Sequence, residues 1–95
     1  MNMRKFGKDK PELMAFQIGD SEKVYTIPLA ASMPASVLIE MGKVTNDETK
    51  LFEYQYGMLR RYIGEAADEL TAGDVRDIMN AWYEESAKQG AEVGE

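Results

Sequence analysis

Two prolines six residues apart set the main constraint on the fold. Pro28 follows an apolar stretch at residues 24–27, and it should end that stretch as a strand because proline cannot donate a hydrogen bond to a strand ladder. Pro34 precedes a run of apolar and small residues, and proline is tolerated in the first turn of a helix. We therefore expect a change from strand to helix between Pro28 and Pro34, with a first helix at about residues 34–42.

The segment before Pro28 has the pattern of a β-hairpin. Two short apolar stretches, residues 14–18 and 24–27, flank a Gly-Asp-Ser sequence that favours a turn. Side chains alternate between the two faces of a strand, which gives each strand one face turned inward. The inward positions predicted in this way are Phe16, Ile18, Tyr25 and Ile27. Because two strands alone are only marginally stable, helices must cover that side.

Helical periodicity predicts three amphipathic helices after the hairpin. In the first helix, the residues on one face are Pro34, Val37, Leu38, Met41 and Val44, whereas Ile39 points to the far side. The second has a broad apolar arc of about 160°. It consists of Leu51, Phe52, Tyr56, Met58, Leu59, Tyr62, Ile63, Ala66 and Leu70. The third buries Val75, Ile78, Met79, Trp82 and Tyr83, with Trp82 as a core anchor.

Local signals mark the ends of these helices. Thr45 and Glu48 fit a capping box at the start of the second helix, and Thr71 opens a similar start for the third. Gly64 weakens the second helix, and we expect a bend or a break near it. The third helix is expected to end at about Gly90.

These elements give an α+β fold that is mainly α, with an N-terminal two-stranded β-hairpin followed by three helices. Ninety-five residues suit one domain, which we place at residues 13–90. Residues 1–12 are predicted to form a mobile basic arm with a net charge of +2, and residues 91–95 a flexible tail.

The composition excludes most catalytic chemistry. The chain has no cysteine and no histidine, so it lacks thiol nucleophiles, thiolate metal ligands and the side chain that titrates near neutral pH. A net charge of −6 opposes binding to a nucleic-acid backbone, and no apolar run is long enough to span a membrane. We therefore predict a binding protein rather than an enzyme, with no catalytic residue, no metal and no cofactor.

Surplus apolar residues indicate where a partner could bind. Seven methionines and nine aromatic residues exceed what a small core needs, and methionine repacks readily against varied partners. The residues predicted to bind a partner are Leu29, Met33, Val37, Ile39, Met41, Tyr54 and Met58. Two alternatives stay open: the methionines fill gaps in the core, and the corner between the prolines merely turns the chain onto its own helices.

Three segments carry a family resemblance. They are VYTIPLAASMPASVLIEM at residues 24–41, FEYQYGMLRRYI at residues 52–63, and LTAGDVRDIMNAWYEESAKQGAEVGE at residues 70–95. Together they resemble the tail assembly chaperones of long-tailed bacteriophages and prophages. The resemblance covers about residues 13–95. Its most specific parts are the Tyr25 to Leu29 strand leading to Pro34, and the Leu70-Thr71 helix start followed by Ala81-Trp82.

The resemblance implies partners and a cellular setting. Members of this family bind the tape measure protein, keep it soluble, and bring tail tube subunits to it, the latter through a longer form made by ribosomal frameshifting. This chain would be the shorter form, self-associating as a homo-oligomer in the host bacterial cytoplasm and absent from the mature virion. No nucleic acid or membrane partner is implied.

Two other functions remain as alternatives. Residues 65–95 carry nine carboxylates against two basic residues, a net charge of −7 that suits an acidic DNA mimic inhibiting a host nucleic-acid enzyme. A hydrolase that uses a lysine-activated serine or a pair of carboxylates is the other, although no local motif supports it.

Overall fold

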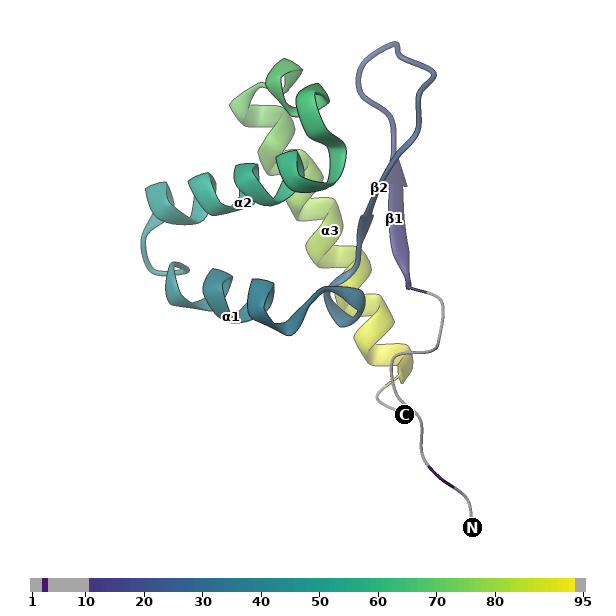
Figure 1. Cartoon of the computed structure of the whole chain (residues 1–95), viewed down its shortest axis with the longest axis vertical. Coiled ribbons are helices and arrows are strands. Elements are labelled where there is room, and N and C mark those ends of the chain that lie inside the picture. Colours follow the sequence, from purple (N-terminus) through teal and green to yellow (C-terminus); the bar gives the residue numbers. More distant parts are fainter. Residues whose placement is uncertain (1–2, 4–10, 94–95) are drawn as a thin grey trace.

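The computed structural model describes residue 3 and residues 11–93 of the chain. Their elements, in order, are β1 (Leu13–Phe16), β2 (Tyr25–Pro28), the 3-10 helix η1 (Ala30–Ser32), α1 (Ala35–Lys43), α2 (Glu48–Ile63), the 3-10 helix η2 (Gly64–Glu69) and α3 (Ala72–Val93) (Figure 1). This order confirms the predicted α+β, mainly α fold with an N-terminal hairpin and three helices. Most of the predicted arm at residues 1–12 lies outside the described residues.

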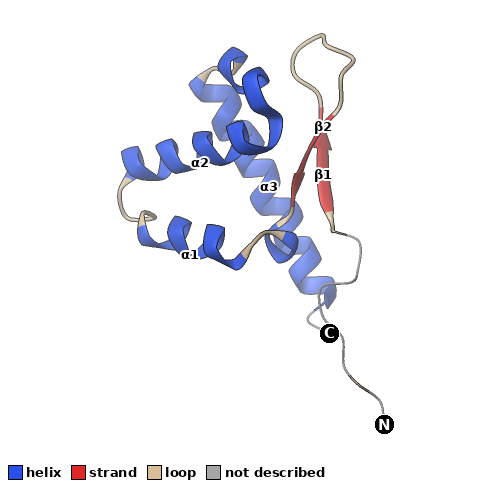
Figure 2. Cartoon of the chain, viewed as in Figure 1, coloured by secondary structure: helices blue, strands red, loops and turns tan. Residues whose placement is uncertain are grey.

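The hairpin is antiparallel, and Met14 pairs with Ile27. Figure 2 shows β2 on the side nearer the helices and β1 on the outer side. Ile27 is fully buried, and its neighbour Met14 is also in the core. Glu12 extends the pairing, because its carbonyl accepts a hydrogen bond of 2.8 Å from the Leu29 N–H and its own N–H donates to Ser32 Oγ at 2.9 Å. These two hydrogen bonds therefore hold the backbone in place from Glu12 onward.

Helix α1 begins one residue later than predicted, because Pro34 takes the N-cap position. Val37 and Met41 point into the core, as periodicity predicts. The predicted inward positions of Pro34 and Leu38 are wrong, since Pro34 is exposed and Leu38 is 37% exposed. The reason is that α1 buries only one narrow stripe of side chains, in which Val37 and Met41 lie one helical turn apart.

Helix α2 is capped by Asp47 rather than by the predicted Thr45. The Asp47 carboxylate accepts a hydrogen bond of 3.1 Å from the Lys50 N–H, whereas the Thr45 hydroxyl donates to the carbonyl of Gly42. Asp47 is the N-cap because its backbone is extended and its carboxylate can accept from the Lys50 N–H, three residues later, which has no partner within the helix.

The predicted break at Gly64 is confirmed. Gly64 has φ 67° and ψ −141°, a conformation that a residue with a Cβ adopts only with strain, and the chain continues from it as η2. Asp68 of η2 accepts hydrogen bonds from Tyr56 Oη and Arg60 Nη1 of α2. The side-chain hydrogen bond with Tyr56, followed by the charge of Asp68, raises the pKa of Arg60 above its ordinary value. These contacts hold η2 against the end of α2.

Helix α3 starts with a reciprocal pair of hydrogen bonds. The Thr71 N–H donates to Asp74 Oδ2 at 2.9 Å, and the Asp74 N–H donates to Thr71 Oγ1 at 3.1 Å, which confirms the predicted start. The helix extends three residues past the predicted end at Gly90, to Val93. The last two residues of the predicted tail lie outside the described part.

The core lies between the hairpin and the helices. Its buried hydrophobic members are Met14, Ile27, Leu29, Met33, Val37, Met41, Met58, Leu59, Ile63, Ala67, Val75, Met79 and Trp82. Trp82 is 2% exposed and acts as the predicted anchor. Gln55 is the one buried polar residue of the described part, and its Nε2 donates to Tyr83 Oη. No helix within residues 11–93 has both the length and the apolar character needed to cross a membrane.

Candidate functional site

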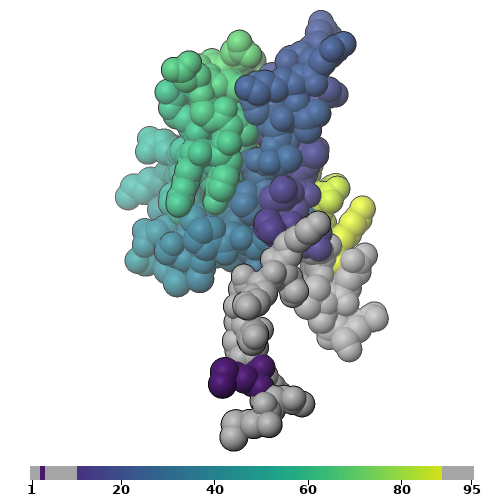
Figure 3. Space-filling view, turned by 45° about the vertical axis from the view of Figure 1, so that its right-hand side comes forward, coloured from purple at the N-terminus to yellow at the C-terminus, as the bar shows by residue number. Residues whose placement is uncertain are grey.

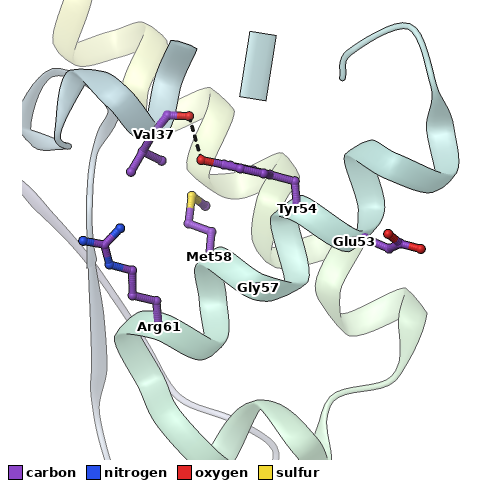
Figure 4. A pocket seen from close by; sticks show the side chains of 6 residues that line it. All are labelled: Val37, Glu53, Tyr54, Gly57, Met58 and Arg61. Atoms are coloured by element: carbon purple, nitrogen blue, oxygen red, sulfur yellow. Dashed lines mark hydrogen bonds between the residues drawn. The ribbon is translucent and has the colours of Figure 1, made fainter. Parts of the chain in front are cut away.

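An open hollow of about 310 Å³ lies between α1 and α2. Its lining residues are Val37, Glu53, Tyr54, Gly57, Met58 and Arg61 (Figure 4). Only Val37 comes from α1; the others lie on α2. The hollow therefore follows one side of α2 and uses α1 as its opposite wall.

Helical spacing explains why these residues share one side. Glu53, Gly57 and Arg61 are four residues apart in succession, so they form a row about 12 Å long at roughly 1.5 Å per residue. Tyr54 and Met58 form the adjacent row, closer to α1. In Figure 4 Glu53 and Arg61 lie at opposite ends of the row, with Gly57 between them.

Gly57 leaves the middle of the row open. A Cβ built at this position would meet no heavy atom within 4 Å, so packing does not require a glycine there. Glycine inside a helix costs about 1 kcal/mol relative to alanine, and Gly57 does not have a positive φ that would explain it. The missing side chain instead keeps the hollow accessible along α2.

A hydrogen bond fixes the width of the hollow at one point. Tyr54 Oη donates to the carbonyl oxygen of Val37 at 3.0 Å, which joins α2 to α1. Val37 and Met58 are 5% and 4% exposed, so they belong to both the core and the wall of the hollow. The apolar part of the lining is therefore rigidly supported from behind.

Charges mark the two ends of the hollow. The ion pairs within the described residues join Lys43 to Glu40 and Arg60 to Asp68, so neither Glu53 nor Arg61 belongs to one of them. An apolar centre with a carboxylate at one end and a guanidinium at the other matches an amphipathic helix that carries the opposite charges. It offers no nucleophile and base in contact, and the described residues contain no cluster of metal-ligating side chains.

The structure separates the predicted partner-binding residues into three groups. Val37, Tyr54 and Met58 line the hollow, and Ile39 is 59% exposed on the outer side of α1. Met33, Met41 and Met58 are each 7% exposed or less, and Met58 reaches the hollow from the core. They are covered by the chain's own helices, because the methionine side chains fill the space between α1, α2 and α3.

The corner between the prolines turns the chain onto its own helices. Leu29 is 3% exposed and Met33 is 7% exposed, so the corner does not present them to a partner. The Ala30 N–H donates to Ser86 Oγ of α3 at 3.0 Å, which attaches the corner to that helix. Of the two alternatives that the sequence left open for this corner, the burial therefore supports the structural one.

Glu53, Gly57 and Arg61 were not predicted as site residues. Helical periodicity places them on the polar side of α2, where charged residues are usually solvated and carry no signal of their own. The signal that could have found them is Gly57. It weakens the helix, and it lies four residues after Glu53 and four residues before Arg61, which carry opposite charges.

No protein-family model matches the sequence, and neither the curated proteins nor the solved structures include a significant match to it.

Proposed function

We propose that the chain is a tail assembly chaperone of a long-tailed phage or prophage, and that it binds a helical segment of the tape measure protein in the hollow between α1 and α2. The observation that carries this proposal is the hollow beside Gly57, which stays open although glycine weakens the helix. The family resemblance of residues 13–95 supplies the identity of the client.

The dimensions of the hollow favour a helical client. A row of about 12 Å corresponds to roughly two turns of a helix, so two apolar side chains spaced three or four residues apart would meet Val37, Tyr54 and Met58. Burial of apolar surface contributes about 25 cal/mol per Å², so we expect the two apolar side chains of the client to supply most of the affinity. A basic residue on the client would lie near Glu53 and an acidic one near Arg61.

Apolar residues of α1 are also exposed outside the lining of the hollow. Ile39 is 59% exposed and Leu38 is 37% exposed, whereas α1 is only nine residues long. A net charge of −6 would keep client-bound copies apart in solution. The remaining parts of the proposal come from the resemblance: homo-oligomers in the host cytoplasm, delivery of tail tube subunits through a longer form, and absence from the virion.

Co-expression with the tape measure protein encoded downstream tests the proposal. The wild-type chain should bring the tape measure protein into the soluble fraction as a complex. Gly57→Leu should reduce the yield of complex several-fold, because a leucine side chain would occupy the hollow. Gly42→Leu is the matched control, since Gly42 is also in a helix and its Cβ would also meet nothing within 4 Å.

The stability of both variants must be measured beside the complex. Equal unfolding free energies for Gly57→Leu and Gly42→Leu would assign a loss of complex to the hollow itself. A tape measure protein that stays insoluble with the wild-type chain would rule out the proposed client. A Gly57→Leu variant that binds as well as wild type would rule out the hollow.

Acidic DNA mimicry is the second candidate, because the carboxylates of η2 and α3 lie on the surface. The exposed ones are Glu65, Asp68, Glu69, Asp74, Asp77, Glu84 and Glu85. Binding to a host nucleic-acid enzyme through these groups should collapse as salt rises, because the screening length is about 10 Å at 0.1 M and about 3 Å at 1 M. Apolar binding of a client helix should persist under the same conditions.

A further inference from the structure

A second hollow lies away from the one between α1 and α2, where the loop after β1 meets the start of α3. Its volume is about 520 Å³. Figure 3 shows the loop beside the green η2 region at one end of the described molecule. The apolar residues in its lining are Ile18, Leu70 and Ile78, all half-buried against the core.

Carboxylates surround this apolar floor. Asp20, Glu69 and Asp77 are exposed members of the lining, and Asp74 adds a fourth carboxylate that also accepts the Thr71 N–H. No lysine or arginine belongs to the described lining, and none of these four groups is in an ion pair of the described residues. The hollow therefore combines an apolar floor with a net charge of −4.

We propose that this hollow binds the basic segment at residues 1–10 of a second copy of the chain. That segment contains Arg4, Lys5, Lys8 and Lys10 against Asp9, which gives 4 − 1 = +3, and it also contains Met3 and Phe6. Cationic residues interspersed with apolar ones match both features of the hollow. Met3 is 77% exposed, so its side chain is not covered by its own copy.

The geometry of the hairpin assigns the segment to a second copy rather than to the same copy. Glu12 is fixed at the start of β1 by a backbone hydrogen bond with Leu29 and by a hydrogen bond to Ser32 Oγ. The hollow is lined by the loop after β1, which Figure 1 shows at the other end of the hairpin. The path from Pro11 to Ile18 covers seven residues, or about 23 Å at roughly 3.3 Å per residue. Folding back over that distance would consume about residues 4–10.

The residues used in folding back include Arg4, Lys5, Lys8 and Lys10. All four basic residues would then remain outside the hollow of the same copy, and the charge complementarity would be lost. A segment that arrives from another copy does not have to fold back, so its whole length can lie in the hollow. The contact joins different surfaces of the two copies, so mutual exchange of the segments would form a two-fold dimer and one-way exchange a head-to-tail chain.

Cysteine crosslinking tests this contact, because the full chain contains no natural cysteine. One preparation carries Met3→Cys in the basic segment, and a second carries Ser21→Cys in the lining of the hollow. The two are mixed in equal amounts at low salt and oxidised mildly, and the products are identified by their intact masses. The control pair combines Met3→Cys with Ser36→Cys on the exposed side of α1.

The expected result is several-fold more mixed dimer from the Met3 and Ser21 pair than from the control pair, with the excess lost at high salt. Equal yields from the two pairs would overturn the proposal. A chain that carries both Met3→Cys and Ser21→Cys should crosslink to a second copy. Crosslinking within one copy on dilution would overturn it as well.

Charge reversal gives a test that does not depend on the cysteine positions. Asp20→Lys with Asp77→Lys in one copy, or Lys5→Glu with Lys8→Glu in another, should each abolish salt-sensitive association in sedimentation velocity. Mixing the two variants should restore it, because the unchanged segment of the hollow variant then meets the unchanged hollow of the segment variant. Failure of the mixture to associate would contradict the proposal. Neither test requires the tape measure protein, so the result is separate from that for the client site.

Discussion

The indole nitrogen of Trp82 donates a hydrogen bond of 2.8 Å to the carbonyl oxygen of Pro28. The two residues are 54 positions apart, so the bond joins the middle of α3 to the end of β2. Pro28 ends the strand, and its carbonyl would otherwise lack a ladder partner on that side. A single side chain thus anchors the helical part of the chain to the hairpin.

Trp82→Phe should lower the free energy of unfolding by about 2 kcal/mol, through loss of a hydrogen bond worth about 1 kcal/mol and of buried contacts. Urea unfolding followed by far-UV circular dichroism measures this change without relying on tryptophan fluorescence. Tyr62→Phe is the control, because Tyr62 is half-buried against the core and its hydroxyl takes part in none of the hydrogen bonds found among the described residues. The interpretation fails if the two variants lose equal stability.

Ser86→Ala should lower the free energy of unfolding by about 1–2 kcal/mol, because the Ala30 N–H would lose its acceptor in a half-buried position. Ser36→Ala makes the same chemical change at an exposed position of α1, and we expect an effect within about 0.5 kcal/mol. Chemical denaturation of both variants measures the difference. A loss that is the same for both would show that the Ser86 contact does not contribute.

Gly64→Ala should be destabilised by about 1–3 kcal/mol, because alanine is strained at φ 67° and ψ −141°. Steric clash does not contribute, since a Cβ at Gly64 would meet nothing within 4 Å. Gly42→Ala should have the opposite sign and stabilise the chain by up to about 1 kcal/mol, because Gly42 is inside α1. Thermal unfolding of the two variants gives a direct comparison, and effects of the same sign would contradict this account.

Asp47→Ala should cost about 1 kcal/mol, the usual effect of removing an N-cap side chain. Thr45→Ala should change stability by no more than about 0.5 kcal/mol, since its hydroxyl bonds only to the exposed end of α1. Urea denaturation measures both. A larger loss for Thr45→Ala would favour the capping box predicted from sequence.

The features predicted correctly from sequence are those with a local cause. Proline cannot continue a strand ladder, and β2 ends at Pro28. Gly64 weakens a helix, and α2 ends there. The start of α3 follows from two side chains three residues apart, Thr71 and Asp74. Each signal depends only on neighbouring residues, which the sequence displays directly.

The features missed depend on which elements become neighbours. Helical periodicity assigns Met41 and Met58 to apolar faces, but it does not tell whether α3, the hairpin or another chain covers them. The apolar arc predicted for the second helix is broader than a single buried stripe, but α2 packs against α1, α3 and β2 and uses most of that arc itself. The hollow beside Gly57 was missed for the same reason, since Val37 on α1 supplies its opposite wall.

Five of the seven methionines, namely Met14, Met33, Met41, Met58 and Met79, are buried in the core. Oxidation converts a thioether into a polar sulfoxide that such a core does not accommodate. While the chain is folded, peroxide should reach the exposed Met3 far sooner than these five sulfur atoms. The order in which the methionines are oxidised would therefore report how often the core opens.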